Sequence, residues 1–207
     1  MIPLRHITLS ALMTAALALP AAAQQTLADG TAIRPEDAAR LEALDRATGA
    51  ALREALGGGT PQQAADAAEA LRGAARPADR IDPKALSGDW RCSMTKIGGI
   101  SPSVTYPPFR CRITADGASL QFEKLTGSQR TSGSIHRDGD SWVYLGSSFV
   151  QGETPRSYAD FPAEMDTRAS ETLPDVGVLE MTGATTGRIL FPLPYRESVL
   201  NVLTLTR

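Results

Sequence analysis

The stretch that decides the fold is Gly88-Asp89-Trp90-Arg91-Cys92, followed by Phe109-Arg110-Cys111-Arg112-Ile113. In both stretches large apolar and polar residues alternate, and this period of two predicts β-strands with one buried face. A Gly-x-Trp sequence that opens an antiparallel run of strands is typical of small up-and-down β-barrels. The alternation therefore predicts that a mainly β domain begins at Gly88.

Strand patterns continue from Gly88 to the C-terminus, separated by turn sequences. Asp116-Gly117 and Asp138-Gly139 are hairpin turn signals, and the last alternation runs over residues 199–206. We count about eight strands, a number that closes into a barrel either filled with side chains or holding one small ligand. Two packed sheets fit the pattern almost as well. We predict an eight-stranded antiparallel up-and-down barrel over residues 88–207, preceded by an N-terminal α-helical hairpin.

The two cysteines, Cys92 and Cys111, each lie on the apolar face of a predicted strand. Antiparallel neighbours would bring these two faces together. An even cysteine count in an exported protein favours a disulfide. The spacing matches neither a redox nor a zinc motif, and histidine partners are missing. We therefore predict a Cys92–Cys111 disulfide and no metal site.

The first residues have the pattern of a signal peptide. Arg5 and His6 form a weakly basic start, the apolar run of residues 7–19 is too short to span a bilayer, and Ala21-Ala22-Ala23 supplies small residues for cleavage. We predict a signal peptide over residues 1–23 that is cleaved near Ala23. The mature protein is then periplasmic or secreted, with no membrane span.

The segment before the barrel is rich in alanine, leucine, arginine and glutamate and has no strand pattern. Pro35 begins a predicted helix, Gly57-Gly58-Gly59 ends it, and Thr60 with Gln63 forms a capping box for a second helix. The apolar face of this pair is thin, so we expect it to pack on the barrel, with docking to a partner as the alternative. The predicted divisions are a flexible N-terminus over 24–34, a helical hairpin over 35–76 and a linker over 77–87.

Composition excludes two classes of partner. The chain has 21 basic and 23 acidic residues and a formal net charge of −2. This balance provides no electrostatic footprint for nucleic acid and no basic patch for an anionic membrane surface. We therefore expect neither nucleic acid nor a membrane surface as a partner.

Motifs for catalysis are missing from the sequence. His136 is the only histidine after the predicted leader, which leaves almost no material for a Ser-His-Asp triad or a metal cluster. There is no Gly-x-Ser-x-Gly elbow and no phosphate-binding glycine loop. Beside Arg137 at a hairpin, His136 is expected to be a solvated turn residue. We predict no catalytic residue, no cofactor and no enzymatic activity.

Three segments are candidates for binding. The loop between the cysteines carries Tyr106 among apolar residues and prolines, and such restraint lowers the entropic cost of binding. Residues 126–133, with Gln129 and Arg130, form a strand of small polar residues that leaves a partly open interior if it faces inward. The long connection over residues 151–174 carries Tyr158 and Phe161, and long connections are often functional lids or disordered.

Several separated blocks together resemble a known family. They include Gly88-Asp89-Trp90-Arg91-Cys92, Tyr106-Pro107-Pro108-Phe109-Arg110-Cys111-Arg112-Ile113 and Thr126-Gly127-Ser128-Gln129-Arg130-Thr131-Ser132-Gly133. In these blocks the chain resembles a bacterial family of exported proteins that is catalogued as a domain of unknown function. The resemblance implies no activity.

A weaker resemblance is to lipocalin-like barrels, including the small periplasmic inhibitors of secreted metalloproteases, through the Gly-x-Trp opening. The resemblance implies an eight-stranded barrel with a disulfide near its start, and an arginine from the last strand over the tryptophan. Arg207 or Arg196 would then cover Trp90 in a cation–π contact that closes one end of the barrel. The inhibitory residues are not carried over, because the helical segment occupies their place.

These observations predict an exported, non-enzymatic binding protein. The first hypothesis is a protein-interaction or inhibitor-like module with an unknown protein partner, and bulky inward residues such as Trp90, Met94 and Phe122 favour the filled barrel that it requires. The second is a lipocalin-like carrier of a small apolar or polar ligand in a hollow barrel. The third is an envelope enzyme.

Overall fold

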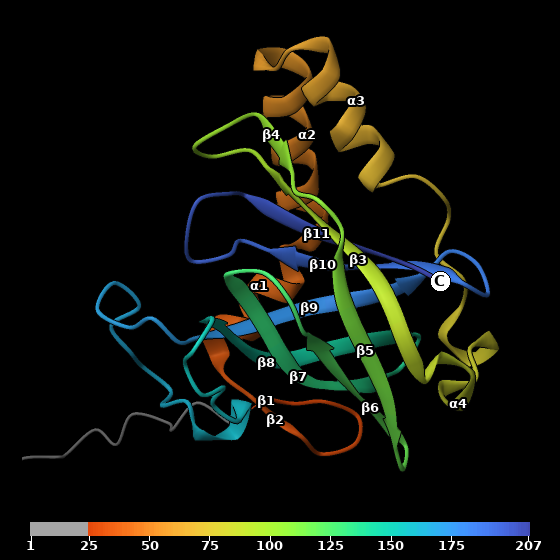
Figure 1. The fold of residues 1–207 in the computed structure, drawn as a ribbon. Coiled ribbons are helices and arrows are strands. Elements are labelled where there is room, and N and C mark those ends of the chain that lie inside the picture. Colours follow the sequence, from red (N-terminus) through yellow and green to blue (C-terminus); the bar gives the residue numbers. More distant parts are fainter. Residues whose placement is uncertain (1–24) are drawn as a thin grey trace, which may run out of the picture.

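The computed structural model describes residues 25–207, and residues 1–24 are drawn as a grey trace (Figure 1). The predicted signal peptide lies outside the described residues.

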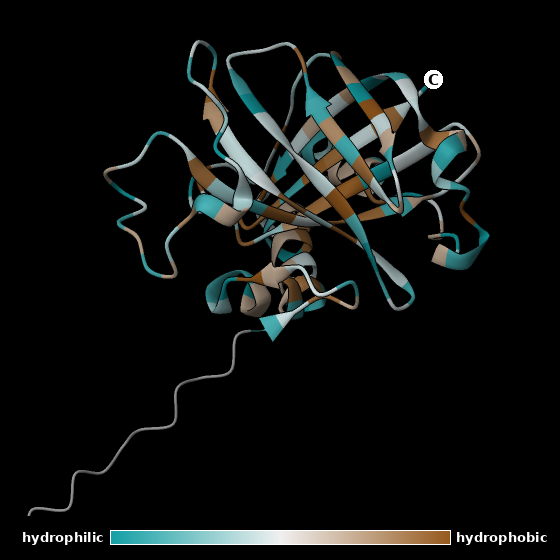
Figure 2. Ribbon diagram, turned by 90° about the horizontal axis from the view of Figure 1, so that it is seen from below, coloured by the Kyte–Doolittle hydropathy of each residue, from teal (hydrophilic) through white to brown (hydrophobic). Residues whose placement is uncertain are grey.

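Eight strands form a closed antiparallel barrel, which confirms the predicted barrel and rules out two packed sheets. Each strand pairs with the next, and β11 pairs back with β3 from Leu200 opposite Ile97 to Thr206 opposite Arg91. Figure 2 shows hydrophilic and hydrophobic residues alternating along the strands. The barrel strands are β3 (Gly88–Ile97), β5 (Phe109–Asp116), β6 (Ser119–Lys124), β7 (Gln129–Asp138), β8 (Ser141–Val150), β9 (Leu173–Met181), β10 (Thr186–Pro192) and β11 (Leu200–Thr206).

A short extra strand, β4 (Ser103–Thr105), pairs with the end of β3, and β5 pairs with its beginning. Pro107 and Pro108 separate β4 from β5, because proline has no N–H for the ladder. The segment between the cysteines, predicted as a loop, is therefore partly a β-hairpin.

Cys92 and Cys111 form the predicted disulfide, with their Cα atoms 6.0 Å apart. They are diagonal neighbours, since Trp90 lies opposite Cys111 in the register of β3 and β5. Both cysteines belong to a core of inward-facing side chains that fills one half of the barrel. This core also contains Trp90, Ile113, Leu120, Phe122, Ile135, Trp142, Tyr144, Leu179, Met181, Ile189, Phe191, Leu203 and Leu205.

The sequence predicted that residues 77–87 are only a linker, but in the structure they also form part of the barrel core. They form a 3-10 turn, η1 (Ala78–Arg80), and the helical turn α4 (Pro83–Leu86). Ala78, Ile81 and Leu86 are buried in the barrel core. The segment therefore covers one end of the barrel.

The helical region contains three helices instead of the predicted two: α1 (Pro35–Glu42), α2 (Leu44–Gly58) and α3 (Pro61–Ala70). The predicted capping box at Thr60 and Gln63 is present. Alanines of α2 and α3 pack against the outward faces of β3, β10 and β11, beside Ile97, Leu190, Leu200 and Val202. Because these side chains are small, the two helices can pack close to the strands. Figure 1 shows α2 and α3 on the outside of the barrel.

Residues 25–34, predicted to be flexible, form a two-stranded hairpin of β1 (Gln25–Thr26) and β2 (Ala32–Ile33). Leu27 and Ile33 are buried against the outward residues Val143, Leu145 and Val176 of the barrel. Burial of these apolar side chains ties the hairpin to the barrel wall. Among the described residues, no helix has the length and apolar character that a membrane span requires.

Candidate ligand-binding site at the open end of the barrel

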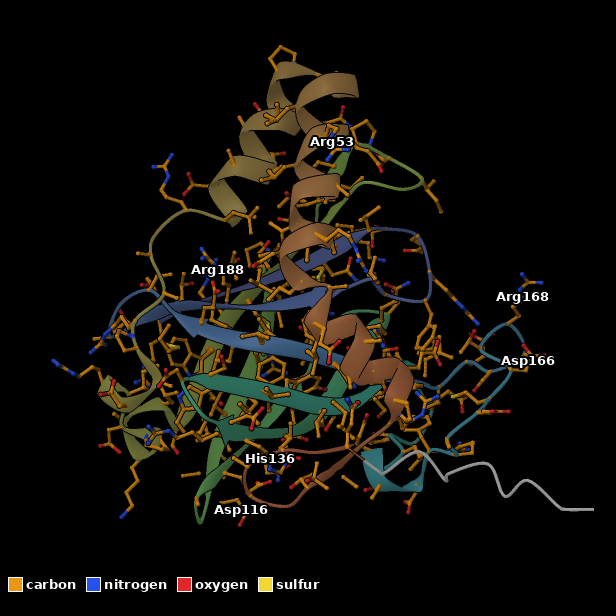
Figure 3. The ribbon with its side chains drawn as sticks, turned by 180° about the vertical axis from the view of Figure 1, so that it is seen from behind. Arg53, Asp116, His136, Asp166, Arg168 and Arg188 are labelled. Carbon is orange, nitrogen blue, oxygen red and sulfur yellow. A yellow bond between two sulfur atoms is a disulfide. The ribbon has the colours of Figure 1, made fainter. Side chains whose placement is uncertain are left out.

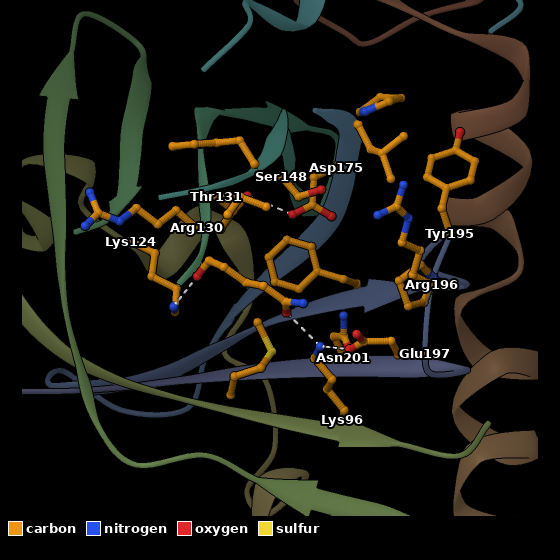
Figure 4. Close-up of a pocket in the computed structure, with 18 of the residues that line it drawn as sticks. Lys96, Lys124, Arg130, Thr131, Ser148, Asp175, Tyr195, Arg196, Glu197 and Asn201 are labelled. Carbon is orange, nitrogen blue, oxygen red and sulfur yellow. Dashed lines mark hydrogen bonds and ion pairs between the residues drawn. The ribbon is translucent and has the colours of Figure 1, made fainter. Parts of the chain in front are cut away.

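The inward face of the barrel changes from apolar to polar along its axis. On β3 the inward residues are Trp90, Cys92 and Met94, and the same alternation turns Lys96 inward at the end that the plug of residues 77–87 does not cover. There, a cavity of about 130 Å³ opens (Figure 4). Its polar lining includes Arg40, Lys96, Lys124, Gln129, Arg130, Thr131, Ser148, Asp175, Arg196, Glu197 and Asn201.

Lys124 is a buried cation in the cavity wall, only 5% exposed. Its Nζ donates hydrogen bonds to the carbonyl oxygens of Thr126, at 2.9 Å, and Gln129. The ammonium also lies 3.7 Å from the centre of the Phe109 ring. Burial, with the positive charges of Arg130 and Lys96, lowers the pKa of Lys124 to about 8. Lys124 therefore remains mostly protonated at neutral pH but releases its proton far more readily than an exposed lysine.

Lys96 and Glu197 form an ion pair across the mouth. Lys96 Nζ also donates a hydrogen bond to Gln129 Oε1 at 2.7 Å. The hydrogen bond from Lys96 lowers the pKa of Glu197. Because Glu197 lies in the connection between β10 and β11, the pair fixes that loop to β3.

Asp175 lies at the end of a hydrogen-bonded chain that leads into the core. Thr131 Oγ1 donates to Asp175 Oδ2 at 2.7 Å and lies 2.6 Å from the hydroxyl of Tyr144. Since the single hydroxyl proton of Thr131 is used on Asp175, Tyr144 donates to Thr131. Burial raises the pKa of Asp175 to about 6. Ionised Asp175 is therefore less favourable here than in water.

A buried ion network holds Arg40 beside the cavity. Asp37 is fully buried and accepts hydrogen bonds from Arg34 and Arg40, each at 2.9 Å, and from the hydroxyl of Tyr158 at 2.8 Å. The Arg40 guanidinium also lies 4.6 Å from the centre of the Tyr195 ring. Its Nη2 is buried and has no hydrogen-bond partner among the described residues.

The sequence-predicted binding residues fall in separate places. Gln129 and Arg130 line the cavity. Tyr106 lies outside this lining, with its ring centre 5.5 Å from Lys96 Nζ. Tyr158 and Phe161 are buried against the outer wall of the barrel, where Tyr158 bonds to Asp37. They hold the 151–172 connection in place instead of forming part of the cavity.

Sequence reasoning missed Arg40, Lys96, Lys124 and Asp175. One signal was available for Lys96, because it continues the inward set of Trp90, Cys92 and Met94 and is the charged member of that set. No comparable pattern marks Arg40, which comes from a helix outside the barrel.

At the opposite end, Arg207 covers Trp90 as the lipocalin resemblance implied. Its guanidinium lies 4.4 Å from the ring centre and donates hydrogen bonds to the carbonyl oxygens of Ser87, at 3.0 Å, and Ala85. Trp90 Nε1 donates to the carbonyl of Leu86 at 2.9 Å. Trp90 and Arg207 therefore fasten the plug to the barrel.

His136 is not the solvated turn residue that the sequence suggested. Its ring lies 2.7 Å from Asp29 Oδ2 and 2.7 Å from Ser134 Oγ, on the outer wall (Figure 3). The connectivity is that of a Ser-His-Asp relay, but both edges of β7 at Ser134 are paired, with Gln121 and with Leu145. The backbone N–H groups there are committed to the ladders and cannot form an oxyanion hole. Within residues 25–207, no group of three His, Cys, Asp or Glu side chains gathers as a metal site.

Comparison with known proteins identifies a family but no relative of known function. No curated protein matches the chain significantly. Among solved structures, the isotype 1 transferrin binding protein B from serogroup B Neisseria meningitidis is similar over 63% of this chain and 27% of that chain. Its sequence identity is 9% and its TM-score is 0.35, so this similarity supports no conclusion about the fold or function of the present chain.

The family comparison covers most of the chain. Residues 30–205 match the model of a family described as a domain of unknown function, DUF4893. The match spans the helical segment and the barrel up to residue 205, within its last strand. It confirms the resemblance to a family of unknown function, and the chain belongs to DUF4893.

Proposed function

We propose that the protein is an exported, non-enzymatic binding protein that holds a small ligand in the open end of its barrel. The observation that carries this proposal is the division of the barrel interior. One half is filled by apolar side chains and covered by the plug, whereas the other contains a polar cavity of about 130 Å³. Ligand sites in β-barrels lie at such mouths, and here polar side chains from several strands converge on the cavity.

Binding is favoured over catalysis because the charged groups of the cavity are committed to the scaffold. Glu197 is paired with Lys96, Lys124 donates to two backbone carbonyls, and Asp175 accepts from Thr131. Groups held in this way are suited to fixing the shape and potential of a cavity. Export rests on the leader pattern of residues 1–23.

The proposal is tested by filling the cavity. Ser148 lines it, so Ser148→Trp places an indole at the mouth (Figure 4). Thr114→Trp is the matched control, because Thr114 is exposed on β5 outside the cavity. The protein is purified from the bacterial periplasm, and released small molecules are identified by mass spectrometry. We expect a molecule that is retained by wild type and Thr114→Trp and is lost in a folded Ser148→Trp protein. Equal retention by all three proteins contradicts the proposal.

A protein-interaction module is the second candidate, and one observation favours it. Ile100, at the tip of the β3–β4 hairpin, is 81% exposed, and Val104 and Tyr106 nearby are 38% exposed. Exposed apolar residues on a restrained hairpin suit contact with a protein surface. The candidate predicts that a protein co-purifying with wild type is lost with Ile100→Asp and kept with Ser148→Trp.

A further inference from the structure

The charges around the cavity are unbalanced toward positive. Three acidic residues line it, Glu171, Asp175 and Glu197, against five basic ones, Arg40, Lys96, Lys124, Arg130 and Arg196. Clefts lined by one sign of charge concentrate ligands of the opposite sign. The imbalance therefore favours an anion.

The acids are already occupied by the protein itself. Glu197 pairs with Lys96, Glu171 lies 3.6 Å from Arg196, and Asp175 accepts the hydroxyl of Thr131. Within residues 25–207, no carboxylate lies within ion-pair distance of Lys124 or Arg130. No carboxylate neutralises these two residues within the described part of the chain, so their positive charge can attract an anion even though Lys124 also donates to two backbone carbonyls.

Arg40 supplies an independent observation. Its side chain is 5% exposed, and its Nη2 is buried without a hydrogen-bond partner among the described residues, although the rest of the guanidinium is well held. Nη1 donates to Asp37 at 2.9 Å and Nε to the carbonyl of Pro192 at 3.3 Å. A buried donor without an acceptor is costly. Since Arg40 lines the cavity, an oxyanion bound there is a candidate acceptor for Nη2.

The remaining lining residues and the cavity volume limit the size of the ligand and favour an apolar part beside its charged group. Met94, Phe191 and Pro194 provide an apolar wall beside the cations. A cavity of roughly 150 Å³ holds a benzene molecule, so about 130 Å³ limits the apolar part of the ligand to at most the size of one small ring, and the charged group lies among the cations that line the open end.

Resting on the proposed binding function, we propose that the ligand is a small organic carboxylate. Its carboxylate accepts from Arg40 and faces Lys124 and Arg130, and its compact apolar body lies against Met94 and Phe191. The protein thereby selects anions over neutral molecules of the same shape.

The test compares one anion with a neutral analogue by isothermal titration calorimetry. Benzoate is the probe, benzyl alcohol its neutral counterpart, and inorganic phosphate a compact anion without an apolar body. We expect wild type to bind benzoate at least about tenfold more tightly than benzyl alcohol, which lacks the charge, and than phosphate, which lacks the apolar ring. Tighter binding of phosphate than of benzoate would overturn the carboxylate assignment.

Two variants connect the binding to the cavity. Lys124→Met removes the buried charge and keeps a side chain of similar length. Arg130→Gln removes a charge that is more exposed, so this variant should fold even if Lys124→Met does not. Each should weaken benzoate binding about tenfold, whereas Arg110→Gln, exposed on β5, should not change it. Unchanged affinity in both variants would overturn the inference.

The outcomes separate this inference from the proposed function. If benzyl alcohol binds as tightly as benzoate and Ser148→Trp abolishes both, the cavity binds ligands but does not select anions. If Ser148→Trp leaves benzoate binding intact, the carboxylate site is not the cavity, and this inference fails. The proposed function fails separately, when the cavity-filling variant retains the same native small molecule as wild type.

Discussion

At the scale of single residues, the open end of the barrel places ionisable groups where water solvates them poorly. Burial raises the pKa of Asp175 to about 6 and lowers that of Lys124 to about 8. In both residues burial disfavours the charged form. The hydrogen bond from Thr131 partly offsets this at Asp175, whereas the positive charges of Arg130 and Lys96 add to it at Lys124. Conformational stability should therefore depend on pH through these two groups.

Replacing Asp175 with asparagine tests this at one position. In the unfolded chain an aspartate has a pKa near 3.9, whereas Asp175 has a pKa of about 6 in the folded protein. Between about pH 4 and 6 the folded protein therefore holds a proton on Asp175 that the unfolded chain has lost. Wild type loses stability as the pH rises through this window. Asp175→Asn keeps an acceptor for Thr131 and removes the charge. We expect it to raise stability at pH 8 by about 1–3 kcal/mol and to have little effect at pH 4, in urea unfolding at both values. A stability gain of the same size at both pH values would contradict the assignment.

At the scale of elements, the plug over residues 77–87 depends on Arg207, which follows β11. Arg207 covers Trp90 and donates to the carbonyls of Ser87 and Ala85, so β3, β11 and α4 meet at one point. On another side of the barrel, Arg188 donates to the carbonyls of Arg72 and Gly73 and fastens the chain after α3 to β10 (Figure 3). Arginines thus tie the N-terminal segment to the barrel at both places.

Removing the plug contact should have a measurable effect. Arg207→Gln loses the cation–π contact and the hydrogen bonds to Ala85 and Ser87, and we expect a loss of about 1–2 kcal/mol in the free energy of unfolding. Proteolysis within residues 77–87 should become faster. Arg53→Gln on the exposed face of α2 is the control and should change neither (Figure 3). Unchanged proteolysis in Arg207→Gln would show that the plug does not depend on this contact.

The disulfide constrains two adjacent strands at the start of the barrel. It closes a loop with a sequence separation of 19 residues, so the double variant Cys92→Ala/Cys111→Ala should lose about 3 kcal/mol of stability in the chain-entropy model. Chemical denaturation with and without dithiothreitol measures this. The reductant should destabilise wild type but not the double variant, and an equal response of the two would contradict a stabilising bridge.

At the scale of the whole molecule, the mature protein is expected to begin at Gln24. The first described strand, β1, starts at Gln25, so cleavage after Ala23 would leave the β1–β2 hairpin intact. Intact-mass measurement of the protein recovered from a bacterial periplasm should give the mass of residues 24–207. A mass that still includes residues 1–23 would contradict export by a cleaved leader.

The strands of the barrel were predictable because each inward side chain alternates with an outward one, as in Trp90, Cys92 and Met94. The disulfide followed from the same alternation. The plug was not predictable, because Ala78, Ile81 and Leu86 have neither a helical nor a strand period in so short a segment. The burial of Leu27 and Ile33 was missed for the same reason.

The sequence by itself determined the strands, the turns, the capping box and the faces that carry the cysteines, because these depend on neighbours within a few residues. Only the tertiary structure decided barrel closure, the plug and the charged cavity. Arg40, Lys96, Lys124 and Asp175 come from a helix and three different strands, and nothing in their spacing brings them together. Their meeting depends on long-range strand pairing and on the packing of α1 against the barrel, which local patterns do not encode.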